Sequence, residues 1–177
     1  MSNLRLLSEH SATNVQSIFI DNTFNSDFNI YKIVISDMNQ SATGGSHNNI
    51  SFITAGGSEV TDAIYDYAHM QLKSYSGFGN DKYQNQRYIR IISQFTGASS
   101  VGANAVFYIF NPFDSTKYTF ALGQSSGFYE TAGLLGTKGI GVLKETSSIA
   151  GLRFFTETTS TTYESIKFKV YGIRVDT

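Results

Sequence analysis

The chain has 177 residues, about the size of one domain, and its 13 Lys and Arg nearly balance its 14 Asp and Glu, for a net charge of −1. This balance argues against wrapping of nucleic acid, which needs a concentrated excess of basic side chains, and against electrostatic docking on an anionic membrane. The absence of cysteine excludes a disulfide scaffold, a cysteine zinc site and thiol catalysis. The N-terminus lacks the apolar core of a signal peptide, and no run approaches the roughly 20 apolar residues of a membrane span.

Apolar and polar residues alternate along most of the chain, which is the pattern of half-buried β-strands. About ten short strands are expected, separated by clusters of Gly, Ser, Asn and Asp. In chain order they fall at residues 16–20, 30–36, 50–54, 65–73, 86–92, 104–111, 117–122, 140–143, 150–155 and 166–171. This spacing predicts an all-β fold, specifically an antiparallel, jelly-roll-like β-sandwich with little helix.

Two of these strands have informative faces. Residues 104–111 are apolar on both faces, which predicts a central strand buried on both sides. In the last strand Ile166, Phe168 and Val170 are expected to face inward, between lysines that face solvent.

Three segments are expected to lie outside the strands. A turn or two of helix is expected near residues 77–85, and the Gly- and Ser-rich residues 123–137 are expected to form a long loop. Residues 1–15 are interpreted as an N-terminal arm or attachment segment, followed by a single sandwich domain at 16–177.

The three histidines, His10, His47 and His69, lie in separate sequence contexts, and none has a second histidine at metal-ligand spacing. We interpret two of them as surface residues and His69 as a residue on the outer face of a strand. No metal or other cofactor is expected.

Carboxylate pairs can hydrolyse glycosidic bonds, and Asp62 and Asp66 are close in sequence. Alternation, however, places Asp66 on the opposite side of its strand from Tyr65 and Tyr67. We therefore interpret both carboxylates as solvated, and Glu157 and Glu164 as solubilising residues beside a Thr-rich turn.

Two glycine-containing motifs fail the structural tests for catalysis. Residues 133–141 lack the Gly-Lys-Ser/Thr order of a phosphate-binding loop, so their glycines are interpreted as turn and bulge positions. Gly123-Gln-Ser-Ser-Gly127 matches a serine-nucleophile pattern, but every histidine lies upstream and no helix is expected after Ser125.

Aromatic residues crowd one stretch that is also rich in Ser, Gly and Asn, a composition typical of adaptable binding surfaces. A protein interface or a carbohydrate platform is one interpretation, and filling of a small core is the other. The candidate interaction residues are Tyr65, Tyr67, Tyr75, Phe78, Tyr83 and Tyr88.

Blocks spread over most of the chain resemble a group of small structural proteins from tailed bacteriophages, especially phages of marine cyanobacteria. The blocks are LLSE (6–9), FNIYKIVI (28–35), YDYA (65–68), YIFNPFD (108–114), KGIGVL (138–143), IAGLRFF (149–155) and VYGIR (170–174). The resemblance implies a non-enzymatic virion surface protein with a jelly-roll-like sandwich, and no catalytic residue can be carried over from it.

Such a protein is expected to decorate the capsid as a decoration or knob protein, with the N-terminal arm docking on the particle. The alternative is a tail-associated fibre or receptor-binding module that recognises a host glycan, and a glycan-depolymerising enzyme is a third possibility. The expected partners are other capsid or tail proteins, further copies of the chain (for example in a trimer), and a host surface glycan for the alternative. Nucleic acid and membrane insertion are not expected.

Overall fold

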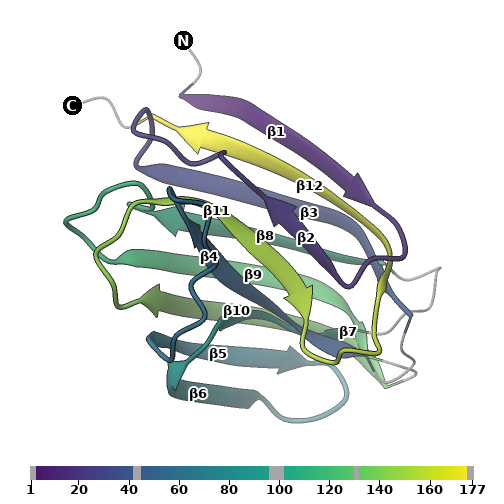
Figure 1. Cartoon of the computed structure of the whole chain (residues 1–177). Helices are drawn as coiled ribbons and strands as arrows, with labels where there is room; N and C mark the ends of the chain where they lie inside the picture. Colours follow the sequence, from purple (N-terminus) through teal and green to yellow (C-terminus); the bar gives the residue numbers. More distant parts are fainter. Residues whose placement is uncertain (1–2, 42–44, 96–101, 130–131, 175–177) are drawn as a thin grey trace.

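A computed structural model describes residues 3–41, 45–95, 102–129 and 132–174, which form twelve β-strands and no helix (Figure 1). Among these residues there is accordingly no helix of the length and apolarity needed to cross a bilayer. The strands are β1 (Leu4–Ala12), β2 (Ser17–Ile20), β3 (Ile30–Gln40), β4 (Ser46–Thr54), β5 (Tyr65–Lys73), β6 (Gly79–Gln86), β7 (Ile89–Phe95), β8 (Ala103–Phe110), β9 (Thr119–Tyr129), β10 (Gly133–Leu143), β11 (Ile149–Thr156) and β12 (Tyr163–Ile173).

The strands form two antiparallel sheets that pack face to face, which confirms the predicted β-sandwich. The large sheet has the order β1-β12-β3-β8-β9-β10-β5-β6, and the small sheet has the order β2-β11-β4-β7. The small sheet covers the inner face of the large one, as Figure 1 shows, so the other face of the large sheet is its outer face.

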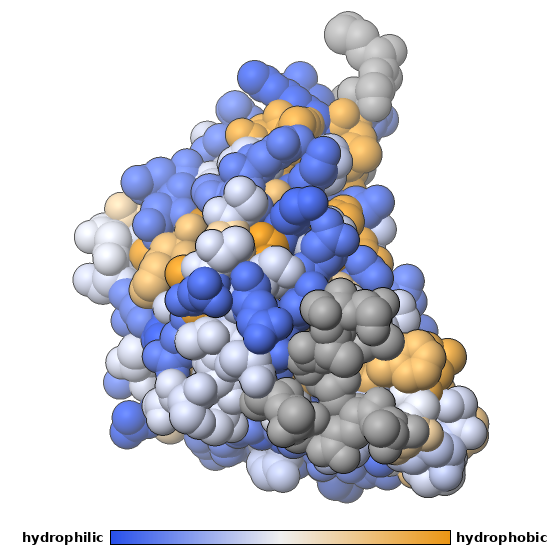
Figure 2. Space-filling model, turned by 90° about the vertical axis from the view of Figure 1, so that its right-hand side faces the viewer, coloured by the Kyte–Doolittle hydropathy of each residue, from blue (hydrophilic) through white to orange (hydrophobic). Residues whose placement is uncertain are grey.

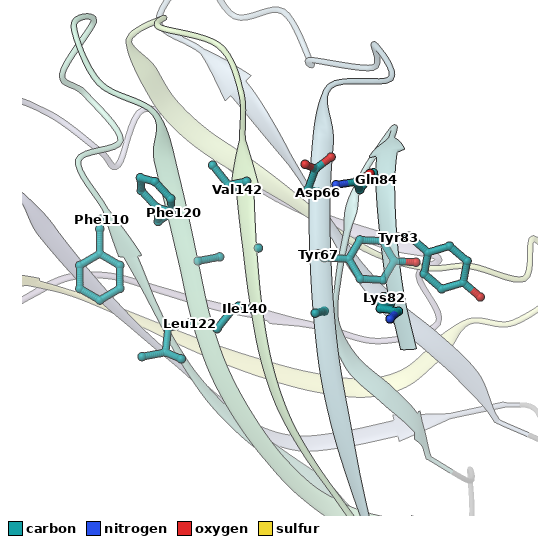
Figure 3. A pocket seen from close by; sticks show the side chains of 13 residues that line it. Asp66, Tyr67, Lys82, Tyr83, Gln84, Phe110, Phe120, Leu122, Ile140 and Val142 are labelled. Carbon is teal, nitrogen blue, oxygen red and sulfur yellow. The ribbon is translucent and has the colours of Figure 1, made fainter. Parts of the chain in front are cut away.

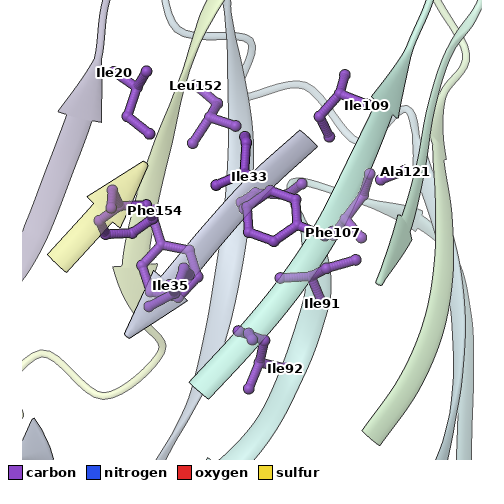
Figure 4. Close-up of a cluster of buried hydrophobic side chains, with 14 of the residues drawn as sticks. Ile20, Ile33, Ile35, Ile91, Ile92, Phe107, Ile109, Ala121, Leu152 and Phe154 are labelled. Carbon is purple, nitrogen blue, oxygen red and sulfur yellow. The ribbon is translucent and has the colours of Figure 1, made fainter. Parts of the chain in front are cut away.

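The core lies between the two sheets and is built by alternate side chains of each strand (Figure 4). The large sheet contributes Ile33, Phe107 and Ile109, and the small sheet contributes Leu152 and Phe154, all fully buried. Ile166, Phe168 and Val170 also face inward, as predicted.

Several inner positions of β9 and β10 are occupied by glycines, among them Gly123, Gly139 and Gly141. A Cβ atom at Gly141 would lie 2.5 Å from Ile89 Cγ2 of β7, and one at Gly123 would lie 3.1 Å from Ile91 Cγ1 of the same strand. The glycines therefore let β7 approach the large sheet closely. Other large apolar residues of these strands, including Leu122 and Ile140, point to the outer face, whereas Leu135 and Leu143 of β10 point into the core.

Three sequence-based expectations were wrong because glycine and polar residues were taken as signs of loops or turns. Residues 79–86 form the edge strand β6, where polar side chains are tolerated because an edge strand is exposed, so the expected turn of helix is absent. Of the expected loop at 123–137, residues 123–129 and 133–137 instead belong to β9 and β10, which pair with each other, and residues 130–131 lie outside the described residues. The glycines at 133–141 lie within β10 and not at a bulge.

Two further expectations change with the sheet order. Most of the expected N-terminal arm is strand β1, which pairs with β12 at the edge of the large sheet. The strand predicted at 104–111 is central, as β8, but it is buried on one face only. Phe107 and Ile109 are fully buried, whereas Tyr108 and Phe110 on the other face are half-buried.

Candidate functional site

The six aromatic residues predicted as one interaction surface divide between the core and the exterior. Tyr65 is fully buried, and its hydroxyl accepts a hydrogen bond from Phe52 N at 3.0 Å and donates to Val60 O at 3.0 Å. Burial raises the pKa of Tyr65 and of Tyr67, which is also buried. Tyr65 and Tyr67 are therefore not surface residues.

The other four predicted aromatic residues are accessible to different degrees. Phe78 is 79% exposed, Tyr83 is 45% exposed and Tyr75, 37% exposed, stacks on Tyr129 at a centroid distance of 6.3 Å. Tyr88 is half-buried. These residues do not form one continuous surface with Tyr65.

A polar cluster instead surrounds Arg90 of β7, and its members are Tyr67, Tyr83, Tyr88 and Glu157. The Arg90 guanidinium lies 5.9 Å from the ring centres of Tyr67 and Tyr83 and 2.6 Å from the Glu157 carboxylate. The Tyr88 hydroxyl donates a hydrogen bond to the same Glu157 oxygen at 2.9 Å. Glu157 is therefore a structural partner of Arg90, and the interpretation of it as a solubilising residue was wrong.

Two histidines lie near this cluster and differ from their expected placement. His69 is buried between the sheets, not on the outer face, and its Nε2 lies 3.1 Å from the Asp81 carboxylate. Burial lowers its pKa. His47 is half-buried in β4, and burial together with the positive charge of Arg90 lowers its pKa to about 4.

The most prominent unexplained surface is the outer face of the large sheet, which carries apolar side chains across strands in register. One row runs Ala68–Ile140–Leu122–Tyr108 through β5, β10, β9 and β8, and a second runs Val142–Phe120–Phe110–Ile30 through β10, β9, β8 and β3. Exposed fractions lie between 37% and 57% for Leu6, Met70, Leu72, Phe120, Leu122, Phe128, Leu134 and Ile140. By contrast, the side of the sandwich seen in Figure 2 is mostly hydrophilic, with apolar atoms in separate patches.

The two apolar rows line a trough of about 920 Å³ in the outer face (Figure 3). Its floor is apolar, and its polar groups gather at the end formed by β5 and β6. The apolar lining comes from Ala68, Phe110, Phe120, Ala121, Leu122, Ile140, Gly141 and Val142, and the other lining residues are Asp66, Tyr67, Lys82, Tyr83 and Gln84.

Asp66, one of the two carboxylates considered for catalysis, lies at the polar end of this trough and is already engaged. Its carboxylate lies 2.8 Å from Lys144 Nζ and accepts a hydrogen bond from Asn85 N at 2.8 Å. The bond from Lys144, followed by that from Asn85, lowers the pKa of Asp66. As predicted, it points away from the face of Tyr65 and Tyr67, and it is held as a charge, not as a proton donor.

The remaining catalytic candidates are not assembled into a site. Ser125 lies within β9, opposite Thr137 and Ala105 in the ladder, so it does not occupy the sharp turn of a nucleophile elbow. Within the described residues no three His, Asp or Glu side chains are grouped so that they could hold a metal ion.

The apolar outer face was visible in the sequence, but we interpreted it as a strand buried on both sides. Alternation places apolar residues on both faces of residues 104–111, which we took as burial of both faces. In the structure this second apolar face is the exposed one. An apolar pattern shows that a face avoids water, and it does not show whether the same chain covers it.

No protein-family model matches the chain, and no curated protein sequence matches it. Among solved structures it is similar to a β-fructofuranosidase from Schwanniomyces occidentalis, with a TM-score of 0.23 and 9% identity over 96% of this chain and 34% of that one. A scytalido-glutamic peptidase gives a TM-score of 0.24 and 10% identity over 91% of this chain and 66% of that one. The mitogen derived from Yersinia pseudotuberculosis gives a TM-score of 0.16 and 9% identity over 100% of this chain and 91% of that one.

The chain thus spans about a third of the fructofuranosidase chain. At these TM-scores and identities, none of the three structures transfers a function to this chain.

Proposed function

We propose that the chain is a non-enzymatic structural protein of a bacteriophage particle and that it attaches to the particle through the outer face of its large sheet. The observation that carries this proposal is the apolar character of that face. If each of its eight exposed large apolar side chains has about 200 Å² of surface, their exposed parts together amount to roughly 700 Å². This total is spread over the whole face, with Lys32 and Lys138 between its parts, and compares with the roughly 800 Å² that one partner buries in a standard interface.

Decoration of the capsid, as a decoration or knob protein, is the role that the shape favours. The described residues form one two-layer unit with no shaft, and one broad face of that unit is apolar. An interface built mainly on apolar contact persists at high salt, where long-range charge attraction is screened. A chain without cysteine also has no thiol to oxidise outside the cell.

The test compares two phenylalanines that have nearly equal exposure on opposite sides of the sandwich. Phe120 is 47% exposed on the large sheet, and Phe19 is 48% exposed on the small sheet. Phe120→Asp is expected to lower incorporation into purified phage particles at least tenfold, measured by quantitative mass spectrometry, whereas Phe19→Asp is expected to be incorporated normally. Equal incorporation of both variants would contradict attachment through this face.

Electron microscopy of intact particles distinguishes the two particle positions. Density for this chain on the capsid is expected. Density only on the tail would remove the decoration role and leave the receptor-binding alternative.

A host glycan at the trough is the second candidate function, and the composition of the trough favours it. Phenylalanine rings line its floor, while the Lys82 ammonium and the Gln84 amide lie at its rim, and sugars are commonly bound between aromatic faces and polar groups. A glycan array with the purified chain is expected to give binding that Phe120→Ala removes and Phe19→Ala retains. No binding at high glycan density, or equal loss in both variants, counts against this candidate.

A further inference from the structure

Three lysines on the outer face have no carboxylate partner among the described residues. Lys82 of β6 and Lys32 of β3 stand at the two ends of the row Ala68–Ile140–Leu122–Tyr108, and Lys138 of β10 lies in the neighbouring row, next to Met70 and Gln124. The backbones of Lys32 and Lys82 are separated by five strand spacings, or roughly 24 Å. The apolar floor of the trough is therefore bracketed by unpaired positive charge.

Both carboxylates in these rows are already neutralised within the chain. Asp66 pairs with Lys144 at 2.8 Å, and Glu9 pairs with Lys169 at 2.9 Å. A second copy docked face to face would bring three more unpaired lysines against these rows, whose own carboxylates are already paired, which is unfavourable. Two concave troughs also leave a gap between them, so self-pairing is poor in shape as well as in charge.

The shape and extent of the surface also argue against a bilayer or a small molecule as its occupant. The trough is concave, whereas a bilayer is nearly flat on this length scale. Further exposed apolar side chains lie on the same face beyond the trough, namely Leu6 on β1, past Lys32, and Leu72 and Leu134 on β5 and β10, past Lys138. A face of this extent matches one side of a protein–protein interface.

Resting on the proposed attachment through the outer face, we propose that the occupant of this face is a different protein of defined surface chemistry. A convex apolar segment of that partner fills the trough, and Asp or Glu side chains beside the segment pair with Lys32, Lys82 and Lys138. Apolar contact supplies most of the affinity, and the lysines set the orientation and exclude basic or self partners.

The test measures fluorescence anisotropy of the full chain with two labelled peptide probes. One is an 18-residue amphipathic helix of Leu and Glu, and the other is the same peptide with Lys in place of every Glu. The chain is expected to bind the acidic probe at least about tenfold more tightly, and this preference is expected to weaken at 0.5 M salt.

Two triple variants show whether these particular lysines are responsible. K32E/K82E/K138E is expected to reverse the preference, so that the basic probe binds more tightly. R87E/K117E/R174E changes the net charge equally at positions outside the three rows, and is expected to retain the preference for the acidic probe. The same reversal in both triples would show a general charge effect and would overturn the assignment.

Three other outcomes also overturn the inference. They are binding of neither probe, a dimer in light scattering that Ile140→Asp dissociates, and capture by phosphatidylglycerol vesicles without binding of the acidic probe. An acidic preference for a chain that is absent from purified particles would remove the proposed virion role and leave this inference standing. If the chain is incorporated into particles through Phe120 but binds both probes equally, the proposed virion role stands and this inference is overturned.

Discussion

The outer faces of the two sheets treat exposed aromatic rings in opposite ways. Phe19, on the small sheet, lies 5.6 Å below the guanidinium of Arg153, which also stacks at 4.5 Å on Phe155 and pairs with Glu59 at 3.3 Å. Phe120, on the large sheet, has Val142 and Phe110 as its ladder neighbours and no such partner. Equal exposure therefore describes two different surroundings, because Arg153 covers Phe19 on the small sheet, whereas no arginine or lysine among the described residues covers Phe120.

The charged groups of the two faces show the same contrast. Arg153 on the outer face of the small sheet pairs with Glu59 at 3.3 Å. Lys32, Lys82 and Lys138 on the large sheet have none among the described residues. On the small sheet's outer face the arginine and the aromatic rings contact one another, whereas the large sheet's outer face has exposed apolar side chains and lysines without a carboxylate partner among the described residues.

The largest expected effect tests the core that both sheets share. Phe107→Ala removes a fully buried ring of the large sheet and is expected to lower the free energy of unfolding by about 3–5 kcal/mol, measured by urea denaturation. Phe120→Ala, on the outer face of the neighbouring strand, is the matched control and should cost less than about 1 kcal/mol. A small effect at Phe107 would mean that the inner face of β8 is not the core face.

Much of this core could be predicted from the sequence, because apolar alternation depends only on which residues avoid water. Ile166, Phe168 and Val170 were placed correctly on this basis. Strand β6, with the sequence GNDKYQNQ, could not be, because its neighbours in the sheet and not its own side chains stabilise it. The inner glycines of β9 and β10 resemble a loop in the sequence. In the structure they are strand residues, and their lack of a side chain lets β7 pack closely against them.

The next effect concerns the polar cluster around Arg90. The pKa of His47 is lowered to about 4, from an ordinary value of 6.5, so protonation favours the unfolded chain. Its contribution to stability is complete above pH 6.5 and is lost as the pH falls toward 4, by at most about 3 kcal/mol. The lowered pKa of His69 acts in the same direction.

Urea unfolding between pH 7 and pH 4 measures this effect. His47→Asn is expected to flatten the decline in stability over that interval, while His10→Asn, on edge strand β1, leaves the decline in place. An unchanged slope in His47→Asn would show that this histidine gains a proton as readily in the folded chain as in the unfolded one.

Removal of the arginine itself has a smaller expected effect. Arg90→Met deprives the Glu157 carboxylate and the rings of Tyr67 and Tyr83 of their cation, and should cost about 2 kcal/mol, because both carboxylates near it retain partial access to water. Lys138→Met on the large sheet should stay within about 0.5 kcal/mol. A double-mutant cycle of Arg90→Met with Glu157→Gln measures the coupling between the two side chains, and a coupling near zero would show that their ion pair does not stabilise the cluster.

The candidate site could be predicted only in part, because sequence alternation does not identify the molecule that covers a face. Tyr65 and Tyr67 were grouped with Tyr75 and Tyr83 because they are close in the sequence. The strand places the first two in the interior. The trough required the register of β8, β9, β10 and β5, which local sequence does not specify.

The smallest expected effect on stability sharpens the comparison most. The double variant Phe120→Ser/Ile140→Ser removes two half-exposed apolar side chains from the outer face, and neither fills a space in the core. The free energy of unfolding should change by less than about 1 kcal/mol for the pair, because surface substitutions outside the core usually change stability by no more than about 0.5 kcal/mol each. The concentration at which the purified chain begins to scatter light should rise, because an uncovered apolar patch promotes association.

The matched variant on the other sheet is Phe19→Ser, which exposes the Arg153 guanidinium and is expected to leave the scattering threshold unchanged. If Phe120→Ser/Ile140→Ser instead destabilised the chain by several kcal/mol, these residues would be part of the chain's own packing. The large sheet's exterior would then be complete without a partner, and the difference between the two faces would have no functional meaning.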